Sequence, residues 1–292
     1  MSVNVKTLVQ AVVPRPIINR GKLVKSSTAI RKAKFALENA SHEPKWLQIS
    51  QLEDLRSEYP VSYFWDDTNI RGPETERVQP LLKKFGLQPK KLIEIGGGPG
   101  YEAWAMANAG HQVTCVDLFD ELDPLAASAG VTSVIGDASN TGLPSNSFDG
   151  YWSFNSFEHL HDPDAALKEA WRLVKNGGLV HINFAPIYNS PLGLHAHYEI
   201  GVPYCQHLWN TDDLAKFVSA KDLWNLNGMS LYDYRYLWSN NSNIFKTLSL
   251  SEEKDYHGLE LISRFPSCFA HKSRDLDYFT TSKLVITLRV SK

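Results

Sequence analysis

Residues 92–100, with the sequence LIEIGGGPG, constrain the fold of this chain more than any other segment. The apolar run at 92–95 is typical of a buried parallel strand, and it breaks directly into a glycine-rich turn. Glycine permits positive φ angles and lets a ligand approach bare backbone. A helical pattern follows at once, from Tyr101 to Asn108. Strand, bare turn and helix N-terminus together predict a nucleotide-binding cradle.

Strand and helix patterns then alternate as far as residue 186. Pro73 opens a helix that precedes the cradle and runs to Phe85. Alternation at this spacing predicts an α/β fold with a Rossmann-like, doubly wound, mostly parallel sheet. Further strands are expected at 112–117, 133–135, 150–154, 179–184 and 283–290, and helices at 121–129 and 164–174.

The remaining segments are less regular. The leader at 1–37 is basic and contains no Asp or Glu, and a helix is expected at 27–39. This leader is interpreted as a solvated arm, with a patch for an anionic substrate, membrane or RNA and a transit peptide as alternatives. Residues 187–210 are rich in Pro, Gly and aromatic side chains, which predicts a lid or binding loop. We expect a helix at 211–224, a strand at 229–237 and partly helical structure at 250–275.

Composition narrows the class of protein. The chain is 43% hydrophobic and 21% charged with a net charge of −2, as in ordinary globular domains. No apolar run approaches the roughly 18 residues that a membrane span needs. The three cysteines lie far apart without a CxxC pair, so no disulfide framework is indicated and a cytoplasmic location is expected.

The glycine-rich turn alone leaves two ligands open. A dinucleotide fingerprint, G-x-G-x-x-G, would place its third glycine where Tyr101 stands. It also gives no role to Glu94, which lies inside the strand before the turn. Further motifs follow in order: Asp117 at the end of the second strand, Asp137 after the third, the run 147–163 containing FEHL, and 167–178 ending in Gly-Gly.

This ordered set resembles the motifs of class I S-adenosylmethionine-dependent methyltransferases, in the small-molecule branch that includes ubiquinone-type methyltransferases. The resemblance covers roughly residues 90–186. It implies that the glycine turn wraps the amino-acid part of the cofactor, that Asp117 accepts hydrogen bonds from the ribose hydroxyls, and that Asp137 meets the adenine amino group. It also implies an antiparallel final strand. The implied cofactor-binding residues are Glu94, Gly96, Gly97, Gly98, Gly100, Asp117, Leu118, Asp137, Ala138 and Asn155, with Arg71 of the leader as a partner for the cofactor carboxylate.

The acceptor side is expected at the carboxyl ends of the fourth and fifth strands, facing the cofactor methyl group. The candidates for a general base there are Glu158, His159, Tyr188, His195 and His197. A second hypothesis has His195, His197 and His207 holding a divalent metal ion, and a third has these histidines making only hydrogen bonds within the loop. The segment 186–197 resembles an insertion found in a subgroup of uncharacterised methyltransferases, some of which come from surface-polysaccharide or secondary-metabolite pathways.

The expected function is methyl transfer from S-adenosylmethionine to an oxygen, nitrogen or carbon of a small-molecule acceptor, such as a sugar or secondary metabolite. The alternatives are an NAD(P)-dependent oxidoreductase and a non-catalytic, RNA-binding methyltransferase-like protein. The Asn/Asp-Pro-Pro-Tyr signature is absent after the fourth strand, which disfavours nucleic-acid base methylation. The expected regions are a basic leader and helical cap (1–70), the cofactor-binding core (71–186), an acceptor-binding lid with late core elements (187–278) and a final strand (279–292).

Overall fold

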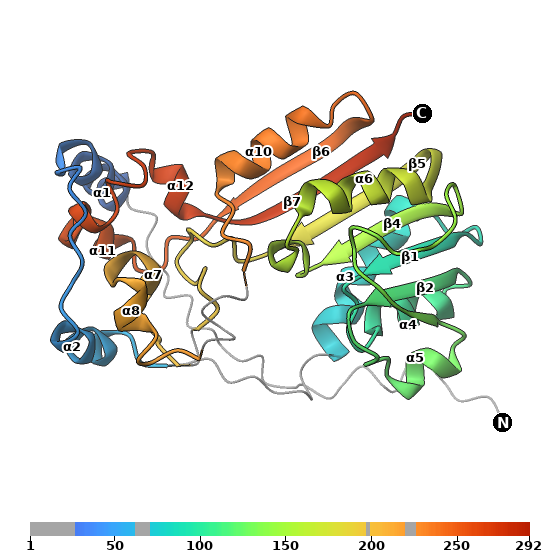
Figure 1. The fold of residues 1–292 in the computed structure, drawn as a ribbon, viewed down its shortest axis with the longest axis horizontal. Coiled ribbons are helices and arrows are strands. Elements are labelled where there is room, and N and C mark those ends of the chain that lie inside the picture. Colours follow the sequence, from blue (N-terminus) through green and yellow to red (C-terminus); the bar gives the residue numbers. More distant parts are fainter. Residues whose placement is uncertain (1–26, 62–70, 197–198, 220–225) are drawn as a thin grey trace.

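The computed structural model describes residues 27–61, 71–196, 199–219 and 226–292. Its centre is a seven-stranded sheet with the order β3-β2-β1-β4-β5-β7-β6 (Figure 1). The first five strands are parallel, and β7 runs antiparallel to both β5 and β6. The expected α/β class and the antiparallel final strand are therefore confirmed. The strands are β1 Lys91–Ile95, β2 Gln112–Asp117, β3 Thr132–Ile135, β4 Phe148–Phe154, β5 Val174–Phe184, β6 Phe245–Lys254 and β7 Thr281–Val290.

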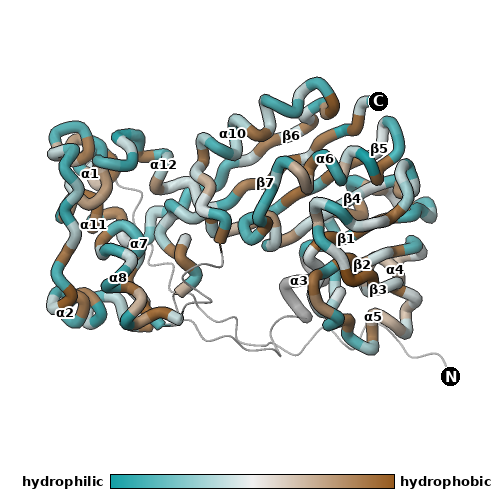
Figure 2. The backbone as a smooth tube through the Cα atoms, viewed as in Figure 1, coloured by the Kyte–Doolittle hydropathy of each residue, from teal (hydrophilic) through white to brown (hydrophobic). Residues whose placement is uncertain are grey.

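Helices cover both faces of this sheet. One face packs against α3 (Arg71–Phe85), α4 (Tyr101–Asn108) and α5 (Pro124–Ser128). The other face packs against α6 (Pro163–Leu173) and α10 (Leu231–Asn240). The inner strands β1, β2 and β4 are mostly buried, which explains why their sequences read as apolar runs, whereas β3 and β6 at the sheet edges are mostly exposed. In Figure 2 the hydrophobic colour gathers along the strands and the inner sides of the helices.

A second, helical body lies beside the sheet and is called the cap below (Figure 1). It has its own apolar core, in which segments from both ends of the described chain meet, since α1 contacts α11. The cap connects to the sheet through the loop that follows β5 and through the strands β6 and β7. Its helices are α1 Ser27–Asn39, α2 Ser50–Glu58, α7 Cys205–Leu208, α8 Thr211–Leu214, α11 Leu259–Arg264 and α12 Leu276–Thr280.

The prediction of a strand at 229–237 is wrong, because most of this segment belongs to the helix α10. Ser230 caps the helix, its hydroxyl accepting from the Asp233 N–H at 3.2 Å while the Asp233 carboxylate accepts from the Ser230 N–H at 2.8 Å. This capping box satisfies two helix-terminal donors. The aromatic residues of this segment recur at helical spacing, and Tyr234 and Trp238 are both part of the core.

Other boundaries differ in smaller ways. The helix expected at 121–129 begins only at Pro124, because Asp123 caps it with its side chain. The helix expected at 211–224 ends at Leu214, and residues 220–225 lie outside the described part of the chain. Strand β6 occupies the start of the segment 250–275, and helix α11 follows. No helix among the described residues is long and apolar enough to span a bilayer.

Candidate active site

The glycine-rich turn joins β1 to α4 and is fixed by the neighbouring strand ends. Gly96 has a φ of 68°, and a Cβ there would lie 2.2 Å from Oγ of Ser156, so a side chain does not fit. The N–H of Gly98 donates to Oδ2 of Asp117 at 2.8 Å, and the Phe119 N–H donates to Oδ1 at 3.4 Å. The carboxylate of Asp117 is thereby held against the turn, at the end of β2.

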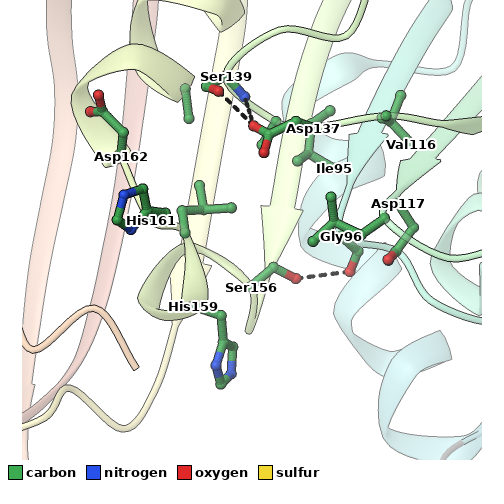
Figure 3. A pocket seen from close by; sticks show the side chains of 15 residues that line it. Ile95, Gly96, Val116, Asp117, Asp137, Ser139, Ser156, His159, His161 and Asp162 are labelled. Atoms are coloured by element: carbon green, nitrogen blue, oxygen red, sulfur yellow. Dashed lines mark hydrogen bonds between the residues drawn. The ribbon is translucent and has the colours of Figure 1, made fainter. Parts of the chain in front are cut away.

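A cavity of about 280 Å³ opens beside this turn, at the carboxyl ends of β1, β2, β3 and β4 (Figure 3). The volume is close to the lower end of the roughly 300–1,000 Å³ typical of ligand pockets. Its walls combine apolar side chains with carboxylate, hydroxyl and imidazole groups, which suits a flat ring joined to a sugar. The lining residues are Ile95, Gly96, Val116, Asp117, Leu118, Gly136, Asp137, Ala138, Ser139, Ser156, His159, Leu160, His161, Asp162 and Ala166.

Asp137 presents a prepared acceptor on this wall. Its Oδ1 accepts from the hydroxyl of Ser139 at 2.6 Å and from the Ser139 N–H at 2.7 Å, as Figure 3 shows. These hydrogen bonds hold the pKa of the Asp137 carboxyl below its usual value. A carboxylate offers about four lone-pair sites, so it retains capacity for a ligand amino group.

Five of the predicted cofactor residues line the cavity, and others support it from behind. Glu94 is 1% exposed and accepts from Nε1 of Trp152 at 2.8 Å. A Cβ on Gly97 would lie 2.7 Å from Oε2 of Glu94, so this carboxylate packs directly under the turn. Asn155 has a φ of 46° and donates its N–H to the Asn183 carbonyl at 2.9 Å. Glu94, Gly97, Gly98, Gly100 and Asn155 are not among the lining residues.

The arginine near the site differs from the predicted one. The side chain of Arg71 lies outside the described part of the structure. Further along the same helix, Arg77 places Nη1 3.4 Å from Oε1 of Glu102 and its guanidinium 5.9 Å from the Phe154 ring centroid. Arg77 was not among the residues predicted from the sequence, and neither was Ser156, whose hydroxyl donates to the Gly96 carbonyl at 2.8 Å. The only sequence signal for them is their position beside residues already singled out.

Three of the five predicted catalytic residues come together. Glu158 and His159 belong to the short helix η3 (Phe157–His159) after β4, and His195 comes from the loop after β5. The ring centroids of His159 and His195 are 5.2 Å apart. Glu158 is 1% exposed, and burial raises the pKa of its carboxyl to about 8. The loop between β5 and α7, which leads into the cap, is called the cap loop below. Residues from the core and from the cap loop therefore meet beside the cavity that His159 lines.

The other predicted catalytic and metal-binding residues lie elsewhere or outside the described chain. Tyr188 packs against the cap core, where burial raises the pKa of its phenol. His197 is outside the described residues. His207 is 2% exposed, packs on the rings of Phe269 and Phe279, and places Nε2 3.3 Å from the Asn189 carbonyl. Among the described residues, the side chains that could share a metal ion with His195 are those of Glu158 and His159, and His207 is not in this group.

Comparison with known proteins agrees with this geometry. Residues 93–182 match the family model described as "Methyltransferase domain". The ubiquinone biosynthesis O-methyltransferase of Pseudomonas aeruginosa (strain LESB58) is 30% identical over 191 residues, covering 60% of this chain and 80% of the relative. The chloroplastic 2-methyl-6-phytyl-1,4-hydroquinone methyltransferase 2 of Oryza sativa subsp. japonica is 30% identical over 128 residues, covering 41% of this chain and 37% of the relative.

Two solved structures share the fold. One is a candidate S-adenosylmethionine-dependent methyltransferase from Listeria monocytogenes, with a TM-score of 0.50 and 13% identity over 75% of this chain and 98% of that one. The other is a complex of a Haloferax volcanii methyltransferase activator with its methyltransferase, with a TM-score of 0.50 and 16% identity over 84% of this chain and 97% of that one. The ordered motifs and the cavity at the strand ends point to the same family as the Pseudomonas relative, which the match covers over 80% of its length. The chain belongs to the class I S-adenosylmethionine-dependent methyltransferases.

Proposed function

We propose that this enzyme methylates a hydroxyl oxygen of a small, ring-containing acceptor. The observation that carries this proposal is the meeting of His159, on the wall of the cofactor cavity, with His195 of the cap loop. The Pseudomonas relative is named as an O-methyltransferase, and the Oryza relative is named for a hydroquinone acceptor. The first name favours oxygen as the methylated atom, and the second favours an aromatic ring in the acceptor.

The cavity fits the nucleoside part of S-adenosylmethionine. Asp117 would accept from the ribose hydroxyls, and Asp137 would accept from the adenine amino group. The apolar walls around Val116 and Leu160 would enclose the ring. Arg77 is the described cation near the turn that we assign to the cofactor carboxylate, in place of Arg71. When bound, S-adenosylmethionine supplies an electrophilic methyl group with a neutral thioether as its leaving group.

The chain itself has two tasks at the acceptor. It must hold the hydroxyl oxygen in line with the methyl group, since alignment alone can lower the barrier by roughly 7–11 kcal/mol. It must also assist loss of the hydroxyl proton, because the ether product no longer carries it. The polar groups placed for both tasks are those of Glu158, His159 and His195, where the core meets the cap loop.

A product assay tests this proposal. The protein is incubated with methyl-labelled S-adenosylmethionine and a panel of catechols, phenols, sugars, amines and carbon acids, and the products are identified by mass spectrometry. We expect label on a hydroxyl oxygen of an aromatic acceptor. Label found only on nitrogen or carbon would contradict the proposal.

Variants separate acceptor chemistry from cofactor binding. His195→Asn should lower turnover while preserving affinity for S-adenosylhomocysteine, because His195 does not line the cofactor cavity. Asn suits the left-handed backbone at this position, where φ is 62°. His42→Asn removes an exposed histidine of the leader and is the matched control, expected to leave both quantities unchanged.

A further inference from the structure

We propose that Glu158, His159 and His195 bind a divalent transition-metal ion, for which zinc is the best chemical match, at the contact between the core and the cap loop. The role given to this ion in methyl transfer rests on the proposed function. The site replaces the predicted histidine set, because it keeps His195 but draws its other ligands from the core. Each of the three side chains offers one ligand atom, and these atoms lie within 4.8 Å of one another.

The ligand set and its dimensions suit zinc after a small contraction. Two imidazoles and one carboxylate are the protein ligands of several catalytic zinc sites. Bond lengths of about 2.0–2.2 Å place tetrahedral ligand atoms about 3.4 Å apart. The present separations therefore have to shorten by up to about 1.4 Å, which side-chain rotation can provide. Because His195 is on the cap loop, metal binding would draw this loop towards the core.

The burial of Glu158 is an independent observation that points to a cation. Its side chain is 1% exposed, and neither carboxylate oxygen has a hydrogen-bond partner in another described residue; the donor that acts on its pKa is its own main-chain N–H. The main chain there is anchored, since the Asn227 N–H donates to the Glu158 carbonyl at 2.9 Å. Burying a carboxyl group without hydrogen-bond partners is costly, and burying its ionised form costs more still. The positive charge of the partly exposed Arg77 lowers the pKa of the Glu158 carboxyl without a hydrogen bond to it. A metal ion would bind the Glu158 carboxylate directly.

The backbone at His195 is a third observation. Its φ of 62° is a left-handed conformation that non-glycine residues rarely adopt and that is concentrated at functional sites. Nδ1 of His195 lies 3.4 Å from the Gly193 carbonyl. Metal-binding histidines usually donate their second ring N–H to such a carbonyl, which fixes the tautomer. This arrangement presents Nε2 of His195 to the metal.

The site would activate the acceptor directly. Three protein ligands leave a fourth coordination position open, as in catalytic zinc sites. An acceptor hydroxyl bound there would have a lowered pKa and release its proton to solvent. Its oxygen lone pair would then form the new O–C bond as the C–S bond breaks, with that electron pair remaining on sulfur. The site adjoins the cofactor cavity, because His159 also lines that cavity.

Metal titration of the untagged, chelator-treated protein tests the inference. We expect saturable binding of one Co²⁺ per chain, read from its absorption spectrum, and displacement of Co²⁺ by Zn²⁺. Glu158→Gln, His159→Gln and His195→Asn should each weaken binding by more than the roughly 10–100-fold that loss of a supporting contact costs. His42→Asn should bind like the parent protein. Thermal unfolding of each variant verifies that it is folded.

The same samples are titrated with S-adenosylhomocysteine, so two failures can be told apart. Absence of saturable metal binding, or binding that all three substitutions leave unchanged, would overturn the metal site even where the cofactor product still binds. Metal binding without affinity for S-adenosylhomocysteine would instead overturn the proposed function. If Glu158→Gln does not fold, His195→Asn decides, because Asn tolerates the backbone at that position.

Discussion

Replacing Asp117 with alanine should sharply weaken cofactor binding. The carboxylate lies at the end of β2, held by the Gly98 N–H at 2.8 Å, and it lines the cavity. A hydrogen bond to a charged group contributes about 1.5–3 kcal/mol, so two ribose hydroxyls together contribute about 3–6 kcal/mol. At about 1.4 kcal/mol per factor of ten, Asp117→Ala should raise the Kd of S-adenosylhomocysteine by roughly 10²–10⁴-fold.

Isothermal titration calorimetry measures this change. Asp120→Ala is the matched control, because it removes the same charge from an exposed position on the same connection without touching the cavity. It should bind S-adenosylhomocysteine like the parent protein. A Kd for Asp117→Ala within about threefold of the parent value would refute the ribose role, since that corresponds to less than about 1 kcal/mol.

Three further predictions follow from other parts of the structure. Gly96→Ala should lower the unfolding temperature far more than Gly98→Ala, because only the first Cβ meets Ser156, at 2.2 Å, although both positions have positive φ; equal losses would contradict this. Burial lowers the pKa of His181 from 6.5 to about 4, so the unfolded chain binds a proton that the folded state excludes. His181 should therefore reduce stability by about 3 kcal/mol as the pH falls from 6.5 to 4. His181→Gln should flatten this part of the pH profile of denaturant unfolding, and an unchanged slope would count against it. Finally, His207→Ala should cost about 2–4 kcal/mol of unfolding free energy through lost packing while leaving Co²⁺ affinity unchanged; lost Co²⁺ affinity in a folded variant would return His207 to the metal set.

Six of the seven strands of the sheet could be predicted because their signals are local, whereas β6 at 245–254 was not predicted. Apolar runs and the glycine turn specify β1 and its neighbours, and α1 and α4 begin and end at the predicted residues. The segment that forms α10 was predicted to be a strand, but the Ser230 cap and packing against the sheet stabilise a helix there. Propensity is a weak guide where tertiary contacts choose the conformation.

The catalytic cluster could be predicted only in part, because it depends on contacts between distant segments. The spacing of His195 and His197 suggested that the loop histidines act together. Burial of His207 among cap aromatics and the approach of His195 to Glu158 and His159 are set by how the loop crosses from sheet to cap. No local pattern in the sequence predicts the path that this loop takes from the sheet to the cap.

The central claim, that this sheet binds S-adenosylmethionine rather than a nicotinamide dinucleotide, is tested most directly by calorimetry on the unmodified protein. S-adenosylhomocysteine and NADH are titrated separately into the same preparation, and then S-adenosylmethionine is titrated in competition with the bound product. We expect saturable binding of S-adenosylhomocysteine, competition by S-adenosylmethionine and no heat of binding from NADH. Saturable binding of NADH with none of S-adenosylhomocysteine would contradict it.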